Sequence, residues 1–141
     1  MQHKDLFKSW IRRVWEDEDL DAIHEMFRPD ATAHGFVDGE HVGPDEFAVF
    51  AGAMLQLLGS VKTEIRHYVE MGDSLAAVLK FTAVDRRSQK PVQFMAQAFC
   101  RVADGIFVEG YNHFDAIGLY EQLDLLPEHT FEICLMGERI G

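Results

Sequence analysis

The fold is decided by residues 92–114, VQFMAQAFCRVADGIFVEGYNHF, which carry a clear β-hairpin signal. Two runs rich in apolar and β-branched residues, Val92 to Val102 and Ile106 to Phe114, lie on either side of Asp104-Gly105. Asp-Gly is a favoured two-residue turn between antiparallel strands, because both of its positions adopt positive φ angles. The stretch therefore predicts a hairpin that turns at Asp104-Gly105.

A two-residue turn also fixes which residues of the hairpin face each other. Side chains alternate along a strand, so five cross-strand pairs are expected to share one face: Val102–Phe107, Cys100–Glu109, Ala98–Tyr111, Ala96–His113 and Phe94–Asp115. Small side chains at Ala96 and Ala98 leave space on this face, and an apolar hollow with a few polar groups is the usual form of a small-molecule site. We expect a ligand pocket beside these two alanines. It is ringed by Tyr111, His113 and Asp115.

The opposite face of the predicted hairpin mixes apolar and polar side chains. It carries Met95, Gln97, Phe99 and Arg101 with Val108, Gly110, Asn112 and Phe114. Such a mixture is neither a clean core face nor a clean solvent face. It suits the outer face of a sheet that a second subunit partly covers, so we expect a homodimer through this face.

The chain before residue 60 has the period of helices. Apolar residues recur at three- and four-residue spacing from Leu6 to Trp15. Asp19 is placed to cap a second short helix, which Pro29-Asp30 ends. Gly43-Pro44-Asp45-Glu46 starts a third helix with proline at its first position, and Gly59 ends that helix.

The period changes to that of strands after the third helix. Thr63 to Met71 and Leu75 to Val84 are predicted to form a first hairpin, joined at Gly72-Asp73. After the second hairpin, Ala116 to Leu126 is predicted to be a short helix, and the partly apolar tail 128–141 is expected to pack against something. Helices followed by an antiparallel sheet indicate an α+β fold with the helices on one face.

Composition limits the classes of partner. The 141 residues suffice for one domain. They include 24 acidic and 13 basic residues, a formal net charge of −11. Nucleic acids and anionic membranes bind clustered Lys and Arg, so neither is an expected partner. The N-terminus has no apolar signal segment, no run approaches the length that spans a bilayer, and the two cysteines form no disulfide framework. The cytoplasm is the expected location.

Three segments resemble the SnoaL-like, polyketide cyclase-like branch of the nuclear transport factor 2-like superfamily. Residues 20–35, which contain FRPDATAHG, look like the second helix and first short strand of that family. Gly43-Pro44 with its aromatic helix looks like the third helix. Ala103 to Leu123 is similar to a turn, a strand with Glu and an aromatic residue, an Asp, and a Gly-Leu…Gln-Leu helix. The chain departs from the pattern at Tyr111, where Trp is common, and at Asp124, where Gly is common.

This resemblance implies a cone-shaped, cystatin-like α+β barrel. N-terminal helices would pack in the concave face of a strongly curved antiparallel sheet, in a protein that is usually dimeric and holds a hydrophobic small molecule. Residues 1–141 would form a single domain, with 128–141 as a C-terminal extension. The scaffold hosts cyclases, isomerases, dehydratases, hydrolases and binding modules, so it does not settle the reaction.

The resemblance also nominates catalytic residues. In polyketide cyclases of this family an Asp near the end of this strand is the general acid/base, and Asp115 matches that position. The alternative is that Asp115 caps the helix beginning at Ala116, which would lower its pKa. His113 could exchange a proton with Asp115, and Tyr111 could donate a hydrogen bond to an enolate oxygen.

The remaining candidates are expected to line the pocket. His34 lies near the entrance of the cone and would form the opposite wall, His67 lies in the first hairpin, and Trp15 and Phe27 are wall or core residues. Metal-ligand spacing, a phosphate loop and a nucleophile elbow are all missing from the sequence, so no metal or other cofactor is expected.

The leading hypothesis is therefore a cofactor-free lyase or isomerase that acts on a hydrophobic carbonyl compound. A non-catalytic ligand-binding or dimerisation module of the same fold is the alternative. An epoxide hydrolase or dehydratase is a third possibility. A hydrolase of that kind needs an Asp-Arg-Asp-like cluster, and Arg101 is predicted to lie on the outer face, away from such a cluster.

Overall fold

The computed structural model describes residues 3–37 and 40–141, so residues 1–2 and 38–39 of the expected single domain lie outside the described residues. The helices are α1 (His3–Ile11), the π-helical turn η1 (Arg12–Glu16), α2 (Asp21–Met26), α3 (Pro44–Leu57), α4 (Ala116–Gln122) and α5 (Thr130–Leu135). The strands are β1 (Phe27–Val37), β2 (Glu40–Val42), β3 (Leu58–Met71), β4 (Ser74–Asp85), β5 (Pro91–Ala103) and β6 (Ile106–Phe114). No helix among the described residues is both long and apolar enough to cross a membrane.

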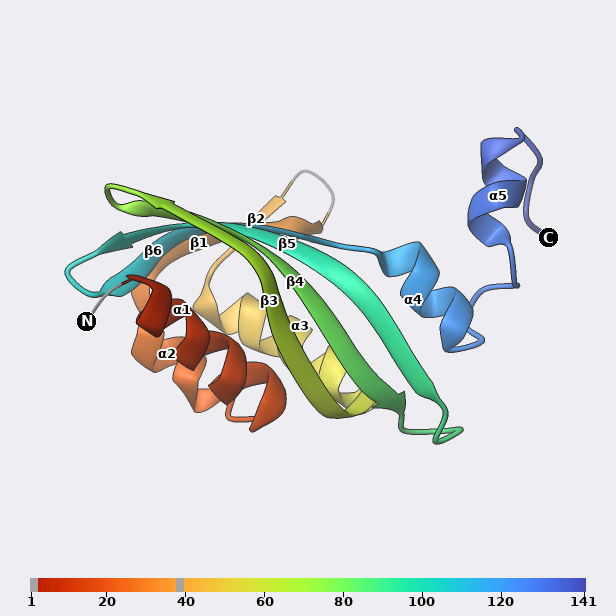
Figure 1. Cartoon of the computed structure of the whole chain (residues 1–141), viewed down its shortest axis with the longest axis horizontal. Coiled ribbons are helices and arrows are strands. Elements are labelled where there is room, and N and C mark those ends of the chain that lie inside the picture. The colour runs from red at the N-terminus through yellow and green to blue at the C-terminus, as the bar shows by residue number, and fades with distance from the viewer. Residues whose placement is uncertain (1–2, 38–39) are drawn as a thin grey trace.

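The molecule has two layers, which confirms the predicted α+β architecture. Six strands form one curved sheet in the order β2-β1-β6-β5-β4-β3, and α1, α2 and α3 pack against its concave face (Figure 1). The sheet is open rather than closed, with β2 and β3 at its edges. An aromatic cluster of Trp10, Phe27, Phe47 and Phe107, with ring centroids 4.7–6.1 Å apart, fills the space between the layers. We call this side of the sheet the inner face and the opposite side the outer face.

One strand pair departs from the predicted antiparallel sheet. β1 runs parallel to β6, with Ala33 beside Gly110 and His34 beside Tyr111, whereas the other neighbouring pairs are antiparallel. Between β1 and β6 the chain passes through α3 and the four strands β2, β3, β4 and β5, and so long a connection permits parallel pairing. The sheet is therefore mixed.

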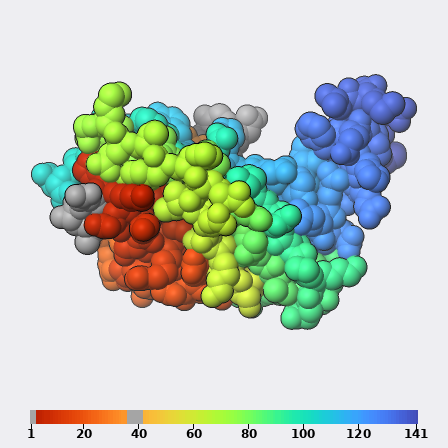
Figure 2. All heavy atoms as spheres, in the orientation of Figure 1, coloured from red at the N-terminus to blue at the C-terminus, as the bar shows by residue number. Residues whose placement is uncertain are grey.

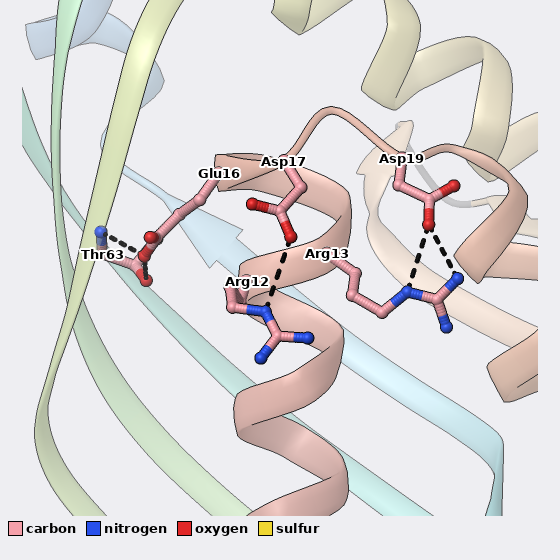
Figure 3. Close-up of polar contacts among 6 residues, drawn as sticks. All are labelled: Arg12, Arg13, Glu16, Asp17, Asp19 and Thr63. Atoms are coloured by element: carbon pink, nitrogen blue, oxygen red, sulfur yellow. Dashed lines mark hydrogen bonds and ion pairs between the residues drawn. The ribbon is translucent and has the colours of Figure 1, made fainter.

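The acidic segment after α1 has a different role from the one predicted. Asp19 was expected to cap α2, but α2 begins after Leu20 without a side-chain cap, and the Asp19 carboxylate instead accepts hydrogen bonds of 3.1 and 2.7 Å from Arg13 (Figure 3). Glu16 accepts a 3.0 Å bond from the backbone N–H of Thr63, which ties η1 to β3. The segment stabilises the join between the helices and the sheet.

The predicted helix bounds are right at some ends and wrong at others. α3 begins at Pro44 as expected, and the Gly43 N–H donates a 3.0 Å bond to the Glu46 side chain. α2 ends at Met26, so Pro29-Asp30 lies inside β1 instead of ending the helix. β1 begins at Phe27, and the Phe27 ring packs in the aromatic cluster, 5.3 Å from the ring of Phe107.

The C-terminal region is the largest surprise of the fold. α4 is shorter than predicted, and residues 128–141 form a separate segment that contains α5 and projects from the body (Figures 1 and 2). The tail was expected to pack, but Phe131, Leu135 and Met136 are exposed in the single chain. The start of α5 is tied to α4, because the N–H groups of His129 and Phe131 donate to the Glu121 carboxylate, at 2.8 and 3.4 Å.

Candidate functional site

The second hairpin contains a β-bulge that decides which residues reach the cavity. Its turn is the predicted one, with φ angles of 54° and 80° at Asp104 and Gly105, and Val102 faces Phe107. The next pair, however, is Arg101 with Glu109. Val108 therefore has no partner and is the extra residue of the bulge.

The bulge reverses the faces of the rest of β6. Because side chains alternate, a shift of one residue moves every later side chain to the other side of the sheet. The inner-face pairs are Cys100–Gly110, Ala98–Asn112 and Ala96–Phe114, and the outer-face pairs are Phe99–Tyr111 and Gln97–His113. The predicted register is right as far as Phe107 and wrong from Glu109 on, so the expected ring of Tyr111 and His113 does not point into the cone.

An apolar cavity of about 60 Å³ lies between the helices and the inner face. α1, η1, α3 and strands β3 to β6 all contribute to its wall: Trp10, Ile11, Trp15, Phe47, Phe50, Met54, Leu58, Val61, Leu79, Phe81, Phe94, Ala96, Gln97, Ala98, Asn112, His113 and Phe114. The expected places of Trp15, Ala96 and Ala98 at the cavity agree with this wall. Trp15 packs edge-on against Phe47, Phe50 and Phe81 with centroid distances of 6.1–6.5 Å.

Asn112 is the polar side chain that the bulge turns toward this cavity. It is half-buried between the inner-face residues Gly110 and Phe114. A Cβ at Gly110 would lie 3.6 Å from the Asn112 Nδ2 atom, in ordinary van der Waals contact with it. Within residues 3–37 and 40–141, no hydrogen bond engages the Asn112 amide, so it can bind a ligand. Sequence reasoning missed Asn112 because the assumed register put it outside, and Gly110 inside a strand was the signal that could have indicated the bulge.

His113 lies where the inner cavity meets a second hollow on the outer face. Among the residues that line the inner cavity, all within the described part of the chain, His113 is the only titratable one. The outer hollow, of about 320 Å³, is lined by His67, Tyr111 and His113 together with parts of β3, β4 and β5. Gln97, Ala98 and His113 contribute to both walls, so the sheet alone separates the two spaces. Three of the predicted site residues are thus brought together, but on the outer face.

The rim of the outer hollow is a charged network. The Tyr111 hydroxyl donates a 2.6 Å hydrogen bond to Glu109, which also accepts a 2.5 Å bond from Arg101 Nε. The phenol and the guanidinium hold the pKa of Glu109 below its ordinary value of 4.5, and the same bond raises the pKa of Tyr111. The His34 ring stacks on Tyr111 at 4.5 Å, so His34 lies on the outer face and does not line the inner cavity.

The depressed pKa of Glu109 predicts a pH dependence of stability. A carboxylate whose pKa is lower in the folded state stabilises that state above its unfolded pKa, and this contribution is lost as the pH falls through the folded pKa. We expect the free energy of unfolding of the Glu109→Gln variant to fall less between pH 6 and pH 3 than that of the wild type. Urea titrations across this range measure it, and parallel curves for the two proteins would contradict the prediction.

Asp115 has the geometry of a helix cap. Its Oδ1 accepts a 2.9 Å bond from the Gly118 N–H at the start of α4, and its side chain is exposed. It lines neither the inner cavity nor the outer hollow. The capping alternative considered from the sequence is therefore confirmed by the hydrogen bond. Phe27 belongs to the aromatic cluster of the core rather than to the cavity wall.

Comparisons with known proteins agree with this architecture. The sheet curved around helices is the fold of AclR, a candidate hydroxylase of Streptomyces galilaeus, with a TM-score of 0.77 and 19% identity over 88% of this chain and 96% of that one. IdmH, a candidate polyketide cyclase of Streptomyces antibioticus, is similar with a TM-score of 0.75 and 18% identity, over 88% and 99% of the two chains. A candidate polyketide cyclase of Bacillus cereus has a TM-score of 0.71 and 23% identity, over 79% and 74%.

These likenesses define the class as the cone-shaped nuclear transport factor 2-like fold. Within that class, the model of the SnoaL-like domain family matches residues 7–110. The chain belongs to the SnoaL-like domain family, as the motifs of its sequence indicated. No curated protein sequence matches it significantly.

Proposed function

We propose that this chain binds a small hydrophobic molecule with one hydrogen-bonding oxygen in its inner cavity. The observation that carries the proposal is the pairing of an apolar wall with the Asn112 amide, which no described residue engages. A ligand oxygen that accepts a hydrogen bond from Asn112 Nδ2 would be fixed in orientation, while the aromatic wall would bind the apolar remainder. Membership of the SnoaL-like family supports the same reading.

The size of the cavity limits the ligand. About 60 Å³ is less than the roughly 150 Å³ of a cavity known to hold benzene. Trp15, Phe50 and Phe114 are only partly buried, so they are the aromatic wall residues that can move aside. A one-ring compound fits this picture better than a fused polycyclic one.

Removal of the Asn112 amide is expected to weaken binding without unfolding the protein. The probe is 4-fluoroacetophenone, titrated by fluorine NMR. We expect Asn112→Ala to raise its Kd about tenfold to a hundredfold, since losing a buried hydrogen bond costs about 1–3 kcal/mol. The free energy of unfolding should change by less than about 0.5 kcal/mol, because the amide stabilises no described group.

Two further variants make this test specific. Thr82→Ala, at an exposed position of β4, should leave the affinity unchanged. Ala98→Leu, which fills the cavity from the β5 wall, should abolish binding. Wild-type affinity in Asn112→Ala, or strong binding by Ala98→Leu, would place the ligand elsewhere and refute the proposal.

A cofactor-free proton transfer, as in a cyclase or isomerase, is the second candidate function, and membership of the SnoaL-like family favours it. Asn112 would stabilise the enolate oxygen of a bound carbonyl compound. The base would have to come from outside the inner cavity, because the His113 side chain lies on the outer face beside Gln97 and Asp115 is engaged as a cap. Deuterium exchange at the methyl group of the bound acetophenone tests this. Exchange no faster than in buffer would refute proton transfer and leave binding as the function.

We also propose that the outer sheet face is the contact surface of a homodimer. Val69, Met95, Phe99 and Tyr111 are exposed there around the outer hollow. The Arg101–Glu109 pair lies at the edge of these apolar side chains. An apolar centre with a charged rim is the usual anatomy of a protein interface.

A further inference from the structure

The outer hollow is a second cavity, which the proposed inner-cavity ligand does not use. It lies on the side of the sheet opposite to α1, α2 and α3 (Figure 1), and it measures about 320 Å³ against about 60 Å³ for the inner cavity. This volume is about twice the roughly 150 Å³ of a cavity known to hold benzene. The hollow therefore admits a one-ring compound without any movement of its wall.

The strand pairing explains the shape of the hollow. Its wall consists largely of two neighbouring rows of side chains that cross β3, β4, β5 and β6: His67–Val78–Gln97–His113 and Val69–Ala76–Phe99–Tyr111. Paired residues on adjacent strands have their side chains on the same face. Ala76 and Val78 are the small members on β4, between larger side chains on either side. They form the floor of the hollow.

Gln97 and His113 are polar side chains of this wall that are available to a ligand. In the part of the chain that the structure describes, neither side chain makes a hydrogen bond or an ion pair. They lie directly opposite each other on β5 and β6, and such pairs have Cβ atoms about 4.5–5.5 Å apart. The amide of Gln97 and the imidazole of His113 each carry an N–H donor. Both donors can therefore converge on one carboxylate, which has two acceptor oxygens.

The charges around the hollow permit an anion. Although the chain has 24 acidic residues, no Asp or Glu is among the described residues that line the hollow. Glu109, on an adjoining row of the outer face, accepts hydrogen bonds from Arg101 and Tyr111. Glu64, on the other adjoining row, pairs with Arg66 at 2.6 Å. The charges of these two carboxylates are balanced locally, so they repel an anion in the hollow only weakly.

We propose that the outer hollow is a second binding site, which takes a compact aromatic carboxylate. The ligand carboxylate accepts hydrogen bonds from Gln97 and His113, and its ring lies over Ala76 against the ring of Phe99, which is 41% exposed. Every group of the site comes from one chain, so the site does not depend on the proposed homodimer. A second copy that rests on the apolar side chains around the hollow can enclose the ligand.

Loss of either donor should weaken the binding of an aromatic carboxylate. The probe is 4-fluorobenzoate, titrated into the full-length chain by fluorine NMR. We expect Gln97→Ala and His113→Ala each to raise its Kd about tenfold, because each variant loses a hydrogen bond to a charged group. Gln56→Ala is the matched control, since Gln56 is also exposed but lies on α3, on the helical side of the sheet. The control should bind like the wild type.

Two further variants separate the outer site from the inner cavity. Ala76 lines the outer hollow and not the inner cavity. Ala76→Leu fills the floor of the hollow, so it should abolish the binding of 4-fluorobenzoate and leave the affinity for 4-fluoroacetophenone within about twofold of the wild type. Asn112→Ala should do the opposite and leave the binding of 4-fluorobenzoate unchanged. Circular dichroism verifies that each variant is folded.

Three results would overturn the second site. A wild type that does not bind 4-fluorobenzoate refutes it outright. Displacement of 4-fluorobenzoate by 4-fluoroacetophenone, or its loss in Asn112→Ala, places the carboxylate in the inner cavity instead. Wild-type affinity in both Gln97→Ala and His113→Ala shows that other groups bind the carboxylate. Failure of 4-fluoroacetophenone to bind the wild type refutes only the inner-cavity ligand, so the two proposals stand or fall separately.

Discussion

Deletion of Val108 is expected to leave the second hairpin folded in its present register. Glu109 would then follow Phe107 directly, so the present pairs Val102–Phe107, Arg101–Glu109 and Cys100–Gly110 would form a regular antiparallel ladder with each side chain on its present face. The variant loses the half-buried Val108 side chain and the local twist of the bulge. We expect this loss to lower the free energy of unfolding by about 1–3 kcal/mol.

Circular dichroism and urea titration of the deletion variant measure this loss. The control is Val108→Ala, which preserves the residue count of β6. Because Val108 is only half-buried, we expect this substitution to cost about 1 kcal/mol. A deletion variant that does not fold would show that the bulge itself is required, and not only the pairing of β5 with β6.

A larger effect is expected at Gly35. Its φ angle is +96°, and a Cβ at this position would lie 1.9 Å from the backbone oxygen of Asn112. The neighbour is backbone rather than a flexible side chain, so β1 and β6 would have to separate where they pair. We expect Gly35→Ala to cost about 4 kcal/mol or more and to displace Asn112 from the cavity.

Gly72→Ala separates the two causes of that cost. Gly72 also has a positive φ, of 61°, but nothing lies within 4 Å of a Cβ built there. Its substitution should therefore cost only the conformational penalty, about 1 kcal/mol. Equal losses for the two variants in urea titrations would mean that the contact with Asn112 contributes nothing.

The elements that depend on local signals were predictable from the sequence. The Asp104-Gly105 turn, the start of α3 at Pro44 and the bounds of β6 follow from rules that act within a few residues. The parallel pairing of β1 with β6 could not be predicted in that way, because it depends on where a distant strand finds its place in the sheet. The projecting position of residues 128–141 could not be predicted either, because apolar residues in a tail indicate burial, whereas Phe131, Leu135 and Met136 are exposed in the single chain.

The candidate site was predictable in part, for a related reason. Ala96 and Ala98 lie on β5, which has no extra residue in its pairing with β6, and they line the cavity as expected. Tyr111 and His113 follow the bulge and face outward. The position of Asp115 before Ala116 allowed two interpretations, a catalytic residue or a helix cap, and the structure shows the cap through the bond to the Gly118 N–H.

The unpaired Val108 also affects how residue roles are carried between relatives. At 18–23% identity, an alignment can easily misplace a gap in β6 by one position. Every later residue of β6 is then matched to a residue on the opposite face of the sheet. Two identical residues in such an alignment can therefore have side chains on opposite faces. For this chain, assigning an aromatic or acidic residue of β6 to a pocket requires counting strand residues from the bulge rather than from the turn.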